Sequence, residues 1–187
     1  FLSVCSIADA DQVTLDDGTM QSVGSVTSDR FLLRNTIGAT PPTTLNIASG
    51  AEITAGVGLF EHAVEATDNS VVNVFGGTLT GGNSSAAILG RGNSVINIFG
   101  GHLVNNANFD LALATSENAT LNIFGGTIAG GTGLGARGID VAGGVTNIFG
   151  GTITASRGAS LDILNDATVN LHGGSIDGNP CRGRQYR

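Results

Sequence analysis

Residues 122–128 read NIFGGTI, and this phrase occurs five times, with small changes, between Asn73 and Ile176. The other copies read NVFGGTL, NIFGGHL, NIFGGTI and NLHGGSI. Successive copies lie 24, 25, 25 and 23 residues apart, as measured between their third positions, Phe75, Phe99, Phe124, Phe149 and His172. A repeat of this length indicates a solenoid, because each unit buries its apolar residues by stacking on the next unit.

Apolar residues alternate on both sides of the Gly-Gly pair, which predicts two short strands in each copy. In the strand before the pair, the residues that flank the aligned asparagine point inward and the asparagine points outward. These inward residues are Val72, Ile96, Leu121, Thr146 and Val169, and Val74, Ile98, Ile123, Ile148 and Leu171. After the pair they are Leu79, Leu103, Ile128, Ile153 and Ile176. A third apolar stretch, at 86–89, 111–114, 138–141 and 161–164, completes three strands per repeat.

Turn-forming residues separate these strands at three corners. The first corner is the Gly-Gly pair itself, and the second falls at 81–82, 105–106, 130–131, 155–156 and 178–179. The third corner falls at Asn69, Asn93, Asn118, Gly143 and Asp166. Glycine, asparagine and aspartate tolerate the left-handed backbone that a sharp bend requires. Three strands and three bends in each repeat predict an all-β, single-domain parallel β-helix with triangular coils.

Fainter copies extend the array toward the N-terminus. Residues 49–53 and 17–20 resemble the Gly-Gly-Thr-Leu part of the phrase, which raises the expected total to about seven coils. We therefore expect an irregular segment and first coil over 1–45, a regular β-helix over 46–179, and a short tail over 180–187.

Composition narrows the classes of partner. The chain has no lysine, eight arginines and a net charge of −7, and no basic stripe appears that would bind nucleic acid. No apolar run approaches the length of a membrane span. The first ten residues, FLSVCSIADA, leave two interpretations open: the end of a secretory signal closing on Ala8-Asp9-Ala10, or a cap strand. With either, the lysine-free sequence suits a secreted or cell-surface protein.

The repeated Asn-Ile-Phe-Gly-Gly-Thr-Ile phrase, with its Gly and Asn corners, resembles the right-handed parallel β-helix repeats of bacterial surface and secreted proteins. Autotransporter passenger domains and pectin-lyase-like proteins share that architecture. The resemblance covers residues 44–179 and implies the fold. It does not select a function, since this class includes polysaccharide lyases, adhesins, phage tailspikes and ice-binding proteins.

Acidic residues do not form a convincing catalytic site. A lyase of the pectate type needs clustered carboxylates for calcium and a basic residue at the scissile bond. The densest group is Glu61, His62, Glu65 and Asp68, with Arg91 one coil further on. Asp110, Glu117, Asp140 and Asp162 are scattered over corners and the third strand. We expect no catalysis, no metal site and no cofactor.

Threonines follow the Gly-Gly pair and give the first candidate surface. Thr78, Thr80, Thr127, Thr152 and Thr154 form two partial columns of the kind that an ice-binding face requires. His102, Val104, Ala129 and Asp177 interrupt these columns, and threonine is common on strands for its β-propensity alone.

The phenylalanines give the second candidate surface, with two interpretations open. Strict alternation sends Phe75, Phe99, Phe124 and Phe149 outward, where an apolar strip invites a partner chain or a carbohydrate. Alternatively, the Gly-Gly bend turns the rings into the core as an internal ladder.

Two cysteines, Cys5 and Cys181, lie near opposite ends of the chain. A disulfide needs Cα atoms within about 7 Å, so the expected stack leaves either free thiols or a bridge between chains. The sequence thus predicts a structural or adhesive β-solenoid that self-associates, in filaments if head-to-tail stacking joins the cysteines. Ice binding and polysaccharide recognition or cleavage are the alternatives.

Overall fold

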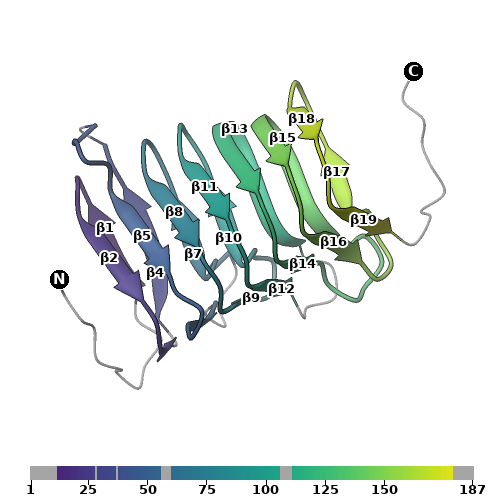
Figure 1. Ribbon diagram of the computed structural model, residues 1–187, viewed down its shortest axis with the longest axis horizontal. Coiled ribbons are helices and arrows are strands. Elements are labelled where there is room, and N and C mark those ends of the chain that lie inside the picture. The colour runs from purple at the N-terminus through teal and green to yellow at the C-terminus, as the bar shows by residue number, and fades with distance from the viewer. Residues whose placement is uncertain (1–11, 28, 37, 56–59, 106–110, 179–187) are drawn as a thin grey trace.

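The computed structural model describes residues 12–178 except positions 28, 37, 56–59 and 106–110. These residues form the strands β1–β19 and no helix (Figure 1). The described part of the chain accordingly holds no helix long and apolar enough to cross a membrane. Every strand pairing in it is parallel, and the strands stack as a β-solenoid, as the repeat predicts.

Three faces surround the core, and each coil contributes to all three (Figure 1). The first face contains β1 (Gln12–Asp16), β4 (Arg30–Arg34), β7 (Val64–Ala66), β10 (Ile88–Gly90), the beginnings of β13 (Leu111–Ile123) and β15 (Arg137–Ile148), and β17 (Leu161–Ile163). The second, here the asparagine face, contains β2 (Met20–Val23), β5 (Thr44–Ile47), β8 (Val71–Val74), β11 (Val95–Ile98), the ends of β13 and β15, and β18 (Thr168–Leu171). The third, here the threonine face, contains β3 (Val26–Thr27), β6 (Glu52–Thr54), β9 (Thr78–Gly81), β12 (His102–Asn105), β14 (Thr127–Ala129), β16 (Thr152–Ala155) and β19 (Ser175–Gly178).

The stack makes about six turns, where the sequence suggested about seven coils. The seven strands of the threonine face are separated by six intervals, each of one turn, so the two numbers describe nearly the same stack. The proposed match of residues 17–20 to the Gly-Gly-Thr-Leu phrase was wrong. Met20 pairs with Thr44 at the start of the asparagine face, so residues 17–20 lie at the third corner and not at the Gly-Gly corner.

The inward columns form one continuous core, as predicted. The largest fully buried side chains include Leu79, Ile96, Leu103, Leu121 and Ile123. The last described coil is less covered, and Leu171 is 60% exposed, because only one neighbouring coil packs against it within the described residues. Two coils also depart from three short strands, since β13 and β15 each run continuously from the first face onto the asparagine face.

The corners match the prediction in part. The second glycine of each Gly-Gly pair is left-handed, with φ between +84° and +95° at Gly77, Gly101, Gly126, Gly151 and Gly174. At the third corner the left-handed residue lies one position earlier than expected in most coils, for example at Asp68 and Glu117. At the second corner the described glycines are not left-handed. Gly130 is required there for close packing instead, because an added Cβ would meet the backbone of Arg137.

Several buried positions carry a polar side-chain atom without a hydrogen-bond partner in the described structure, and Thr146 on an inward column is one of them. The Thr146 hydroxyl is fully buried among the apolar columns and has no hydrogen-bond partner in the described structure. A buried unsatisfied hydroxyl costs roughly 1–3 kcal/mol, so Thr146→Val is expected to raise the free energy of unfolding by about 1 kcal/mol. Urea titration would show this, with outward Thr120→Val as a control expected to change little. A lower stability for Thr146→Val would mean that the hydroxyl is satisfied.

Candidate functional site

The asparagine face carries three side-chain columns that run along the solenoid. Its central column is a ladder of amides in which each Nδ2 donates to the Oδ1 of the preceding coil at 2.9 Å. The ladder comprises Asn46, Asn73, Asn97, Asn122, Asn147 and Asn170. On one side lies a column of Thr44, Val71, Val95, Thr120, Val145 and Thr168. No residue of these two columns is charged.

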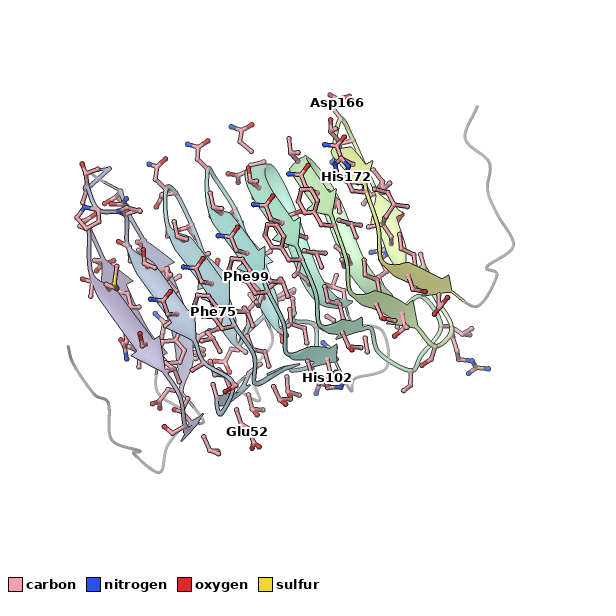
Figure 2. All side chains as sticks on the ribbon, viewed as in Figure 1. Glu52, Phe75, Phe99, His102, Asp166 and His172 are labelled. Carbon is pink, nitrogen blue, oxygen red and sulfur yellow. The ribbon has the colours of Figure 1, made fainter. Side chains whose placement is uncertain are left out.

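The phenylalanines form the third column, on the other side of the ladder, and they face solvent. Phe75 is 55% exposed, and Phe99, Phe124 and Phe149 are 45–46% exposed. The rings are stacked with centroids 5.0–5.2 Å apart and planes within 7°, and His172 continues the stack at 4.8 Å (Figure 2). Of the two interpretations that the sequence left open, the internal ladder is therefore wrong.

The backbone explains this orientation. The Phe75 N–H still donates to the Ile47 carbonyl at 2.8 Å, and the Phe99 N–H donates to Val74 in the same way. The parallel ladder thus continues through the phenylalanine, and alternation directs its ring outward. The bend comes only at the second glycine, two residues later.

Stacking determines what the column offers to a partner. Phe99 and Phe124 each have a neighbouring ring on both faces. Solvent therefore meets mainly ring edges, which are apolar and carry the positive end of the ring quadrupole. A sugar that stacks on an aromatic face finds both faces of the inner rings already covered.

The threonine columns lie on a different face, as predicted (Figure 2 labels Glu52 and His102 on it). One column reads Glu52, Thr78, His102, Thr127, Thr152 and Ser175 in register. The next reads Thr54, Thr80, Val104, Ala129, Thr154 and Asp177. The interruptions noted in the sequence fall within these columns, so the hydroxyl array is not continuous.

The first face brings together part of the acidic group. Glu65 lies 3.9 Å from the Arg91 Nε, and the Ala86 N–H donates to His62 Nδ1 at 2.8 Å. Burial lowers the pKa of His62, Arg91 lowers it further, and Glu65 opposes this effect. The backbone hydrogen bond requires an unprotonated Nδ1, so His62 is a neutral, structural histidine here.

Asp140 and Asp162 are adjacent in register, although the sequence suggested that they were scattered. Arg137 joins them, with Nη1 2.8 Å from Asp140 and Nε 2.7 Å from Asp162. Burial raises the pKa of Asp140, and Asp162 adds to this while Arg137 counteracts it. The 22-residue spacing of the two aspartates, close to one repeat, was the signal in the sequence.

The stability of the protein should fall as His62 becomes protonated. The folded-state pKa of His62 lies below the unfolded value of 6.5. The contribution of neutral His62 to the free energy of unfolding is complete above pH 6.5. It is lost as the pH falls from 6.5 to the lowered pKa of the folded state. Denaturant unfolding at several pH values should show this slope, and His62→Asn should flatten it. An equal slope in the variant would assign the effect to other groups.

No group of three or more histidines, cysteines, aspartates or glutamates within the described ranges is arranged to hold a metal ion. Cys5 and Cys181, Asp110 and the N-terminal decapeptide lie outside the described residues. Comparisons with protein families, with curated proteins and with solved structures found no match to this chain. The phenylalanine column on the asparagine face is therefore the candidate site with the most distinctive geometry.

Proposed function

We propose that this protein is a structural or adhesive β-solenoid of the cell exterior and that the asparagine face is its contact surface. The observation that carries the proposal is the stack of four phenylalanine rings, each about half exposed. The resemblance to autotransporter passengers and other secreted β-helices supports the location. A lysine-free chain with a net charge of −7 is consistent with it.

The exposed area supports a contact role. A phenylalanine side chain contributes about 200 Å² when fully exposed, so four half-exposed rings present roughly 400 Å². A continuous apolar patch of this size is among the largest on an ordinary monomer and is often functional. Since the neighbouring columns are uncharged, the whole face suits an apolar partner rather than an ionic one.

Adsorption to alkyl-coated and hydroxyl-coated surfaces tests the proposal. The wild-type protein should be retained on the alkyl surface, and the double variant Phe99→Ser/Phe124→Ser should lose most of that retention. Phe60→Ser is the matched control, because Phe60 is 70% exposed but lies outside the column. Equal retention of all three proteins would contradict the proposed surface. Both variants should keep the circular dichroism spectrum of the wild type.

Ice binding is the second candidate, supported by the in-register threonine columns. Thermal hysteresis of the purified protein would reveal it, and Thr152→Lys should abolish the effect. Polysaccharide recognition remains an alternative that turnover or binding on a panel of acidic glycans would detect. The covered ring faces favour neither stacking of sugars nor a carbohydrate groove on the asparagine face.

A further inference from the structure

We infer that the partner of the asparagine face is a second copy of this chain, with phenylalanine column packed against phenylalanine column. The inference rests on the proposed function, because it takes this face to be the contact surface and names what covers it. Three properties of the face point to a second copy: its period, its lack of charge and its area.

The period of the column selects its partner. Ring centroids recur every 5.0–5.2 Å, so the strip presents a row of edges separated by shallow gaps. A partner fills those gaps only if its own apolar groups recur with the same spacing. A second copy has that spacing by construction, and its rings can interleave with the first set. Because the faces of the inner rings are already covered within each column, the contact joins ring edges and is stabilised by the apolar area that it buries.

The absence of charged residues makes this face suitable for close approach between two copies. Two copies of a chain with a net charge of −7 repel each other in general. Beside the phenylalanines, the other two outward columns of the asparagine face contain only asparagine, threonine and valine from Thr44 to Thr168. Because identical columns oppose each other across a two-fold axis, an uncharged face avoids like charges meeting.

The area is sufficient when the whole face is used. The rings of two copies supply about 800 Å², whereas a standard stable interface buries about 1,200–2,000 Å². The amide ladder and the valine–threonine column lie on the same flat face and supply the remainder. A two-fold axis parallel to the strands places all three columns opposite their counterparts. Such a contact closes on itself and gives a dimer rather than a filament.

Sedimentation velocity of the full chain under reducing conditions tests the inference. The protein concentration should run from about 1 μM to about 1 mM, because this range distinguishes moderate from very weak association. Reduction removes any covalent link through Cys5 or Cys181. The wild-type chain should dimerise within this range, and Phe99→Ser/Phe124→Ser should weaken the dimer about 100-fold or more. Phe60→Ser should dimerise like the wild type. A wild-type chain that stays monomeric at every concentration overturns the inference.

A second double variant keeps the test decisive if loss of the rings disturbs folding. Val95→Lys/Val145→Lys retains all four rings and introduces positive charges into a column that faces its own counterpart in the dimer. It should also be monomeric while keeping the wild-type melting temperature within a few degrees. A folded lysine variant that dimerises normally overturns the inference. If adsorption to an alkyl surface still depends on Phe99 and Phe124 in a monomeric wild type, the proposed function survives and only the second copy is wrong.

Discussion

Gly77→Ala is expected to lower the free energy of unfolding by about 3 kcal/mol or more. Gly77 has a φ of +84°, where a side chain costs about 1–2 kcal/mol. An added Cβ would also meet the backbone carbonyl oxygens of the preceding coil, at Ala51 and, at 2.9 Å, at Ala48. Neither oxygen can move without disturbing a coil contact. For a chain of this length the loss corresponds to a melting temperature lower by about 6 °C or more.

Gly135→Ala is the matched control for that experiment. Gly135 has a φ of +87°, nearly equal to that of Gly77, but an added Cβ meets nothing within 4 Å. The control therefore carries the conformational cost without the steric one, and should lose only about 1–2 kcal/mol. Equal losses in the two variants would show that the coils do not approach each other closely at the Gly-Gly corner.

Ile123→Ala should lower the free energy of unfolding by about 2–5 kcal/mol, as large-to-small changes in packed cores do. Ile123 is 1% exposed and lies in the middle of the stack, with coils packed on both sides. Neighbouring coils are held at the strand spacing by parallel ladders, so they cannot collapse into the space left by the missing atoms. Thermal or urea unfolding measures the loss directly.

Asn122→Ala provides the comparison for Ile123. Asn122 donates to Asn97 and accepts from Asn147, both at 2.9 Å, on the solvent side of the same strand. Two hydrogen bonds of net value near 1 kcal/mol each predict a loss of about 2 kcal/mol or less. A larger loss at Asn122 than at Ile123 would reverse the inward and outward assignment of the strand.

The inward columns and most corners could be predicted because each depends on local, repeated chemistry. Alternation sets the buried face of a strand, and the Gly-Gly pair marks a bend that needs a left-handed residue. The same rules left the phenylalanines undecided, since a bend after Phe75 is compatible with either direction. The direction of the rings depends on whether the phenylalanine N–H still donates to the preceding coil, and this is set by how that neighbouring coil packs.

Other features depend on contacts that a single repeat does not contain. β13 continues through the third corner, with a register shift between Glu117 and Thr120, because its pairing with β15 extends across that corner. The Arg137 bridge to two aspartates depends on which irregular third-strand residues share a register. The exposure of the phenylalanine column likewise shows where a partner can bind. The spacing of the rings, the uncharged columns beside them and the area of the face indicate which partner fits.

The in-register stack is tested most directly by a distance along the asparagine face. Spin labels at positions 20 and 168, in a chain with both native cysteines replaced by serine, mark the first and last rungs of one outward column. Six parallel pairings separate these rungs, which corresponds to a backbone separation of about 29 Å at roughly 4.8 Å per strand. Pulsed electron–electron double resonance between the two labels should report this separation. A single narrow distribution near that value is the predicted result. A broad distribution, or one centred far from it, would contradict the solenoid and the phenylalanine column built on it.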